Sequence, residues 1–218
     1  DLRPTRATFD LLRPVRMQPI CLECRVVREG PRLMVLDAML VQHGELVARG
    51  SVLFLREVAA SSPGGDTWSP EVPVAGHPSL SVIESADEGR LYFSTRVGWT
   101  AAATDHRNND RKQVWQSPLK LLKDETPSGF QAAAIASDLV NVTTNLGSAG
   151  VEYINADVTL LLTRTPAPGA GIGVAATERV QGDGIVAGSS SIFDGDGVVG
   201  IASTTALLNN RRTPRGFG

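Results

Sequence analysis

The stretch EYINADVTLLLTR, residues 152–164, is the most informative part of this chain. Its second residue is an aromatic one, and Asn155 and Asp157 follow near its start. The rest is almost wholly apolar up to Arg164. This pattern predicts a β-strand with a polar entrance and a buried remainder. Asn155 is explained either as a turn-forming residue at the strand entrance or as a functional amide.

A second copy of this pattern lies near the start of the chain. Four places in the first copy correspond to four in the second, each at a separation near 151 to 153 residues. The matching pairs are Phe9 to Arg13 with Leu160 to Arg164, Gly30 with Gly182, His43-Gly44 with Asp194-Gly195, and ARGSVLFL at 48–55 with GIASTTAL at 200–207. Repetition at a nearly constant spacing indicates an internal duplication.

Each copy predicts an antiparallel meander of four strands, because apolar runs alternate with turn signals. The expected strands are 7–15, 20–28, 33–42 and 46–56 in the first copy, and 152–164, 171–181, 184–194 and 197–208 in the second. Further extended segments are expected at 91–97 and from Trp115 onward.

One segment has a convincing helical pattern. TPSGFQAAAIASDLVNV, residues 126–142, is expected to form a helix with Thr126 as its N-cap and Pro127 in the first helical position. The first copy has no such helix ahead of its strands. If the copies are equivalent, a strand and a helix precede Asp1 and are missing from this chain.

The expected organisation has two repeats joined by a linker. Residues 1–58 form the first, partial repeat, and 59–90 form a surface linker rich in Ser, Pro, Gly and acidic residues. Residues 91–212 form the second repeat, and 213–218 form a tail.

Composition narrows the functional classes. The chain has 218 residues, a formal net charge of -2, 42% hydrophobic residues and 20% charged residues, which is ordinary for a globular protein. This balance disfavours nucleic acid as a partner. No apolar run is long enough for a membrane span, and the expected location is cytoplasmic.

The sequence offers no metal site. Cys21 and Cys24 form CLEC, but a zinc site needs two further ligands, and the three histidines have no paired spacing. Both cysteines are therefore interpreted as structural. GAGIGVAA at 169–176 leads into a strand and not a helix, so it is interpreted as a turn and not as a phosphate-binding loop.

Taken together, FQAAAIASDLVN (130–141), EYINADVTLLLTR and DGDGVVGIASTTALL (194–208) resemble the acyl-CoA thioesterase II-like family. RPTRATFDLLRPV (3–15) and residues 25–50 are similar to the first repeat of that family without its opening strand and helix. The resemblance implies an α+β double hot-dog fold, in which each of two curved antiparallel sheets wraps a helix. The first helix would be absent from this chain.

Three side chains match functional positions of the family. Phe130, Ala134 and Asp138 are spaced by four, so they share one helix stripe, and Asp138 is expected to project from the buried face, where a carboxylate needs partners. The resemblance implies that Asp138 activates the hydrolytic water and that Asn155 helps to hold it. Thr204 stands where the family carries Gln, and its shorter side chain puts activity in doubt.

The implied function is hydrolysis of fatty acyl-CoA thioesters, without a metal or bound cofactor. The alternative is a catalytically silent double hot-dog protein that binds acyl or CoA groups or serves as an assembly subunit. An acyl-CoA is the expected small-molecule partner. Long exposed sheet edges also predict a homo-oligomer, a dimer of double hot-dogs.

Overall fold

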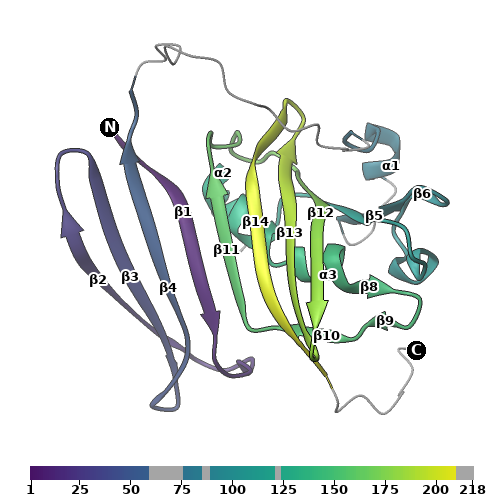
Figure 1. The fold of residues 1–218 in the computed structure, drawn as a ribbon. Helices are drawn as coiled ribbons and strands as arrows, with labels where there is room; N and C mark the ends of the chain where they lie inside the picture. Colours follow the sequence, from purple (N-terminus) through teal and green to yellow (C-terminus); the bar gives the residue numbers. More distant parts are fainter. Residues whose placement is uncertain (59–75, 85–88, 121–123, 210–218) are drawn as a thin grey trace.

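The computed structural model describes residues 1–58, 76–84, 89–120 and 124–209 (Figure 1). Within these ranges, twelve strands form one antiparallel sheet in the order β2-β3-β4-β1-β11-β14-β13-β12-β7-β5-β6, and β10 also pairs with β14. The predicted linker 59–90 and tail 213–218 lie largely or wholly outside the described residues, so these domain boundaries stay a prediction.

The first group of strands follows the predicted meander. It consists of β1 (Leu2–Leu11), β2 (Cys21–Glu29), β3 (Leu33–Gln42) and β4 (Glu45–Arg56). The strand prediction for 33–42 is confirmed to the residue, whereas the first strand begins earlier than expected and ends at Leu11. The ladder ends there because the N–H groups of Leu12 and Arg13 both donate to the Val47 carbonyl, and Pro14 has no N–H with which to continue it.

The strands of the second group follow the same order as those of the first, counted outward from the strand at which the two groups meet. It consists of β11 (Asp157–Leu162), β14 (Gly197–Leu208), β13 (Ile185–Asp194) and β12 (Ile172–Gly182), with the short β10 (Tyr153–Asn155) beside β14. The expected strand 152–164 is interrupted at Ala156. The chain bends there, and the Ala156 N–H donates to the Thr205 carbonyl over 2.8 Å.

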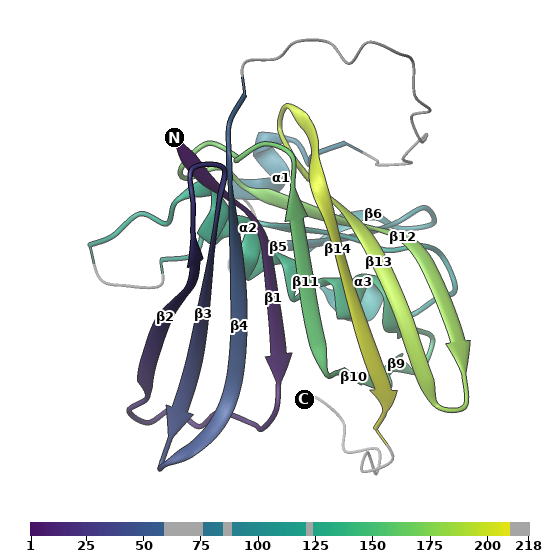
Figure 2. The same cartoon turned by 60° about the vertical axis from the view of Figure 1, so that its left-hand side comes forward.

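The two groups are joined through their innermost strands. β1 pairs with β11 in antiparallel register, with Thr8 opposite Thr159, Ala7 opposite Leu160 and Phe9 opposite Val158. This pairing converts two meanders into one continuous sheet, whose curvature is visible in Figure 2.

Shorter elements complete the fold. Beyond β12 lie β7 (Gln113–Gln116), β5 (Arg90–Ser94) and β6 (Gly98–Thr100). A separate two-stranded ladder joins β8 (Leu146–Gly147) to β9 (Gly150–Val151). Sequence periodicity did not predict β6, β8, β9, helix α1 (Leu80–Glu84) or the 3-10 helix η1 (Ala103–His106).

The predicted helix is present but is divided in two. α2 spans Gly129–Ser137 and α3 spans Val140–Asn145. Thr126 is not the N-cap: Ser128 is, and its hydroxyl accepts from the Gln131 N–H while the Gln131 side chain accepts from the Ser128 N–H. This capping box satisfies two helix-end donors and starts the helix two residues later than predicted.

Small residues bring both helices close to the inner face of the second group. Ala133 and Ala136 of α2 and Val140 of α3 are fully buried in the main apolar core, together with Leu160 of β11. Gly188 of β13 lies under α3, and a Cβ built there falls 2.7 Å from the side chain of Thr144. The close approach of α3 to the sheet therefore requires glycine at this position.

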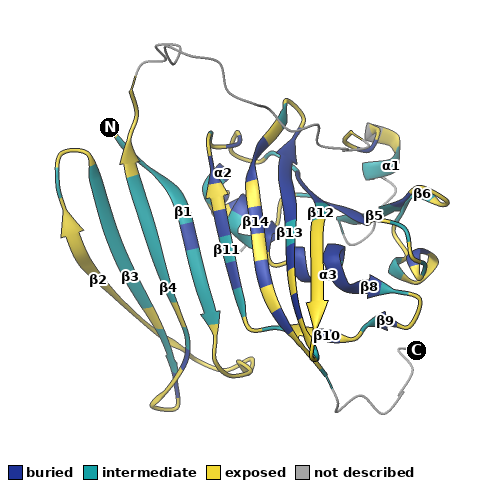
Figure 3. Cartoon of the chain, viewed as in Figure 1, coloured by how far each residue is buried: buried dark blue, intermediate teal, exposed yellow. Residues whose placement is uncertain are grey.

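The first group contains far fewer buried residues than the second (Figure 3). Every residue of β2 is exposed, and the side chains of Leu22 and Val26 are 63% and 50% exposed. Both cysteines, Cys21 and Cys24, are free and exposed on this strand. Within the described residues, α2 and α3 lie behind β11 to β14 in Figure 1 and leave β2 and β3 uncovered.

Arg164 closes the end of the second group. Its guanidinium donates to both carboxylate oxygens of Asp194, over 2.7 and 2.6 Å, and to the Gly197 carbonyl over 3.2 Å. Burial by itself raises the pKa of Asp194, but the hydrogen bonds from Arg164, the backbone hydrogen bonds and the charge of Arg164 together outweigh it and hold that pKa below the ordinary value. The arginine at the end of EYINADVTLLLTR thus fastens β11 to the β13–β14 hairpin.

His106 is a buried polar anchor beside β5. Its ring nitrogens lie 2.9 Å from the Ser94 hydroxyl and 3.0 Å from the Thr100 hydroxyl. Burial lowers the pKa of His106 below 6.5, and the nearby carboxylate of Asp105 offsets part of this effect. The folded state therefore favours the neutral ring.

The packing of α3 predicts the effect of a single methyl group. Gly188→Ala is expected to destabilise the fold by about 2 kcal/mol, because the new Cβ meets Thr144 in a well-packed core. Thermal unfolding is expected to shift down by roughly 4 to 8 °C for a chain of this size. Gly182→Ala is the control, since nothing lies within 4 Å of its Cβ position; equal melting temperatures for the two variants would contradict the packing argument.

The burial of His106 predicts a pH dependence of stability. As pH falls below about 6.5, the unfolded chain takes up a proton that the folded ring resists, so the free energy of unfolding decreases down to the lowered pKa. Denaturant titrations at about pH 7.5 and about pH 5.5 measure this slope. His106→Gln should reduce the slope and His43→Gln, at an exposed site, should not; identical slopes in all three proteins would refute the assignment.

Candidate active site

Asp138 lies at the break between α2 and α3. It is the C-cap of α2, with φ -61° and ψ -24°, and its N–H donates to the Ala136 carbonyl. The expectation that its side chain points into the core is wrong, because Asp138 is exposed. The buried stripe of α2 runs through Ala133 and Ala136 and not through Ala134, so position 138 falls at the edge of the packed face.

Asn155 is brought against Asp138. The amide Nδ2 of Asn155 donates to Asp138 Oδ1 over 2.8 Å, from the end of β10 to the end of α2. The hydrogen bond joins residues that are 17 positions apart in the chain. Two of the three predicted side chains therefore meet directly, and no hydrogen bond to Asp138 Oδ2 forms within the described part of the chain.

Thr204 is engaged elsewhere. Its side chain is buried on β14, and its hydroxyl donates to the Asp157 carbonyl over 2.7 Å. Asp157 is half-buried, and its carboxylate accepts from the Thr205 N–H. Among the described residues, no hydrogen bond joins Thr204 to Asp138 or Asn155.

An apolar pocket opens beside Asp138. Its volume is about 320 Å³. Asp138 is the one ionisable side chain among the residues that line it, and the remainder are Phe9, Leu11, Ala134, Ile135, Ser137 and Val158. The carboxylate thus stands at the wall of a space suited to a hydrocarbon chain.

The first group of strands supplies part of this wall, which sequence reasoning did not foresee. Phe9 and Leu11 come from β1 and reach the pocket because β1 pairs with β11, where Phe9 is opposite Val158. No local pattern signals this contact. The sequence signal that could indicate this contact is the internal duplication, in which Phe9 corresponds to Leu160.

The chemistry available at this site is that of a carboxylate with one oxygen oriented by an amide. Such a carboxylate can position a water molecule and accept its proton. Among the described residues, no group of three or more His, Cys, Asp or Glu side chains is arranged to hold a metal ion.

Comparison with protein-family models gives two matches that together span most of the chain. Residues 1–55 match the acyl-CoA thioesterase N-terminal domain, and residues 62–208 match the acyl-CoA thioesterase C-terminal domain. The chain belongs to the acyl-CoA thioesterase family. No curated protein sequence matches it significantly.

Solved structures show that this family member has the hot-dog fold. An acyl-CoA thioesterase II, TesB2, from Mycobacterium marinum has a TM-score of 0.64 at 19% identity, over 100% of this chain and 83% of that chain. A tesB protein from Mycobacterium avium subsp. paratuberculosis has a TM-score of 0.65 at 14% identity, over 95% and 79% of the two chains. A hot-dog protein of unknown function from Alicyclobacillus acidocaldarius has a TM-score of 0.65 at 14% identity, over 96% and 80%.

The helices that the structure describes in this family member have at most nine residues. Within the part of the chain that the structure describes, none is long and apolar enough to cross a membrane.

Proposed function

We propose that this chain hydrolyses fatty acyl-CoA thioesters to a free acid and CoA, with Asp138 as the general base. The observation that carries the proposal is the hydrogen bond from Asn155 to Asp138 at the wall of an apolar pocket. Membership of the acyl-CoA thioesterase family supports the same reaction. The acyl chain would occupy the pocket beside Phe9 and Val158.

In the proposed step, a water molecule held by Asp138 Oδ2 attacks the thioester carbonyl carbon. Asp138 takes the proton as the carbon–oxygen bond forms, and then returns a proton to the departing CoA sulfur as the carbon–sulfur bond breaks. Asn155 fixes the orientation of the carboxylate through Oδ1. The Thr204 hydroxyl donates to Asp157 and keeps a lone pair with which to accept a hydrogen bond from the water.

We also propose that the two strand groups are copies of one unit, so that the fold is a double hot-dog. β4 and β14 each have 12 residues, and β3 and β13 each have 10. The register of each β3–β4 or β13–β14 hairpin shifts at the same place, after Leu40 and after Ile192. A helix over the first group, dimerisation and the cytoplasmic location stay predictions.

Substitution of Asp138 tests the mechanism. Asp138→Asn keeps the size of the side chain and removes the base, so kcat for acyl-CoA hydrolysis is expected to fall by roughly 10² to 10⁴. Asn155→Ala should lower kcat by about 10-fold, because the carboxylate loses its orienting amide. Thr204→Val removes the hydroxyl and keeps the volume of the side chain, so it should lower kcat without unfolding the protein.

The assay measures release of the free thiol over a series of acyl chain lengths. Asp157→Asn, at a carboxylate outside the pocket, is the control. Turnover that survives Asp138→Asn would exclude Asp138 as the base, and no turnover by the unmodified protein at any chain length would favour the catalytically silent alternative.

Filling the pocket tests where the acyl chain lies. Ala134→Leu should lower kcat/KM progressively as the acyl chain lengthens, because each methylene excluded from an apolar site forfeits about 0.8 kcal/mol. Ala187→Leu makes the same change at an exposed site on β13 and is the matched control. Equal chain-length profiles for the two variants would place the acyl chain elsewhere.

A further inference from the structure

An apolar groove crosses the outer face of the sheet where the two strand groups meet. Its volume is about 460 Å³. Arg6 is the one charged side chain among the residues that line it, and it lies there with leucines of β4 and β11 and with Ile201 of β14. None of the lining residues also lines the pocket beside Asp138. The proposed hydrolysis step therefore makes no use of this groove.

Strand pairing arranges the centre of the groove as one row of side chains. Arg6 of β1 is opposite Leu53 of β4 and also opposite Leu161 of β11. Leu161 is in turn opposite Ile201 of β14, and the four strands lie side by side in Figure 1. Residues directly opposite in antiparallel strands share a face, with their Cβ atoms about 5 Å apart. One positive charge thus stands in a row of three large apolar side chains.

The row lies on the face of the sheet that is turned away from the helices. Val158 lines the pocket beside Asp138, and Leu160 is fully buried in the core with the alanines of α2. Leu161, the next residue of β11, is 40% exposed. Alternation along the strand places Leu161 on the opposite face from the other two. The sheet therefore separates the groove from the pocket proposed for the acyl chain.

The apolar part of this face is short. Ile201 is 52% exposed and Val198 is 42% exposed. Two residues along each strand, the corresponding row carries hydroxyl groups alone, from Ser51, Thr8, Thr159 and Ser203. An exposed apolar patch with a polar rim is typical of a binding site. A second copy packed against this face would also bury the hydroxyl row, so the arrangement favours a small ligand.

Arg6 has no hydrogen-bond or ion-pair partner within the part of the chain that the structure describes, and its Nε is buried. A buried N–H without an acceptor loses the hydrogen bond that water would provide. An unpaired guanidinium in an apolar groove therefore indicates a ligand that brings its own acceptor. A carboxylate is well suited to this role, because its two oxygens can accept two parallel hydrogen bonds from one guanidinium.

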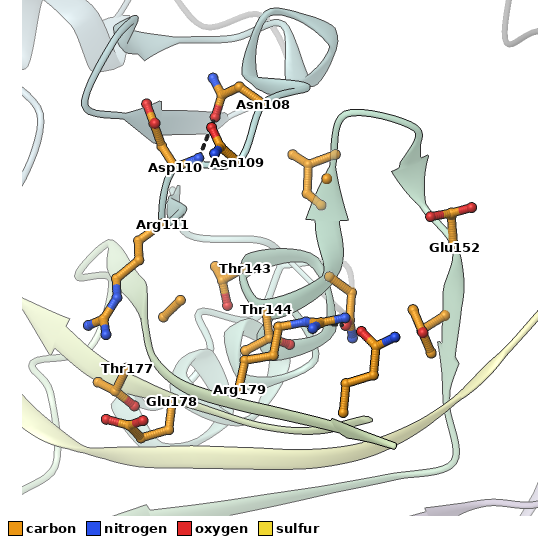
Figure 4. A pocket seen from close by; sticks show the side chains of 16 residues that line it. Asn108, Asn109, Asp110, Arg111, Thr143, Thr144, Glu152, Thr177, Glu178 and Arg179 are labelled. Carbon is orange, nitrogen blue, oxygen red and sulfur yellow. Dashed lines mark hydrogen bonds between the residues drawn. The ribbon is translucent and has the colours of Figure 1, made fainter. Parts of the chain in front are cut away.

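The charges at the end of the groove also favour an anion. Arg3 lies there and is paired with Glu57 over 3.3 Å, whereas Arg56 forms no salt bridge with a described carboxylate. The polar pocket shown in Figure 4 is different, since Glu152 and Glu178 line it together with two arginines. The groove on the outer face thus combines an unbalanced positive charge with apolar walls.

From this combination we propose that the groove binds a free fatty acid. The carboxylate accepts hydrogen bonds from the guanidinium of Arg6, and the hydrocarbon chain covers Leu53, Leu161 and Ile201. This site goes beyond the proposed function and does not depend on it, because binding in the groove requires no hydrolysis.

Removing the charge from either partner tests the contact. In calorimetric titration, the dissociation constant for decanoate should rise about tenfold in Arg6→Met, which keeps an unbranched apolar side chain. Decan-1-ol lacks the carboxylate, so it should bind the variant and the unmodified protein alike. Arg25→Met, at an exposed site on β2, is the matched control and should leave decanoate affinity unchanged. Equal decanoate affinity in Arg6→Met and the unmodified protein would overturn the proposal.

The pocket beside Asp138 could also take a hydrocarbon chain, so two further variants separate the two places. Ala134→Leu narrows that pocket and should leave the Arg6-dependent binding of decanoate intact. Leu161→Asp sets a carboxylate opposite Arg6 in the groove and should abolish this binding. Loss of binding in the first variant and not in the second would refute the groove. Decanoate binding in the groove without hydrolysis of any acyl-CoA would refute the catalytic function alone.

Two measurements control for folding and for self-association. Arg6→Met removes an unpaired buried N–H, so its melting temperature should equal or exceed that of the unmodified protein. A lower melting temperature would show that the guanidinium has a partner within the fold, and the premise would fail. Sedimentation should give the same oligomeric state for the unmodified protein and Leu161→Asp. A dimer that dissociates in this variant would assign the groove to a second copy and overturn the proposal.

Discussion

Backbone pairing between β1 and β11 is the constraint on which the site depends. It joins two four-stranded groups into one sheet and places Phe9 beside Val158. The second group provides the helices and the carboxylate, whereas the first provides part of the apolar wall. Neither group alone encloses the pocket, so the candidate site is a property of the joined sheet.

The position of Asp138 follows from how the helical segment is divided. α2 packs by its alanines and ends at Ser137, and α3 continues against Gly188. The carboxylate between them stays in contact with solvent and is held by one amide, that of Asn155. A fully buried carboxylate would favour its protonated form, which cannot serve as a base, so this edge position suits the proposed chemistry.

Much of the fold could be predicted from the sequence, because hairpin turns and apolar runs mark strands such as β3 and β14 locally. The helix start is harder to predict, because Thr126 with Pro127 and Ser128 with Gln131 both have the pattern of a helix N-terminus, and the capping box of the second pair sets the start. The contact of Asp138 with Asn155 was also predicted, from family positions. The exposure of Asp138 and the role of Phe9 depend on tertiary packing across the sheet, which local periodicity does not encode.

Because the apolar pocket is lined from both sides of the β1–β11 pairing, the two halves of the chain cannot diverge independently. A substitution at Phe9 changes the surroundings of Asp138, which lies about 130 residues later in the chain. A substitution at Val158 likewise changes the surroundings of Phe9. Selection for a new substrate therefore acts on paired changes in both halves. The duplication proposed above would therefore keep its two copies in one chain, because each copy supplies part of the same pocket.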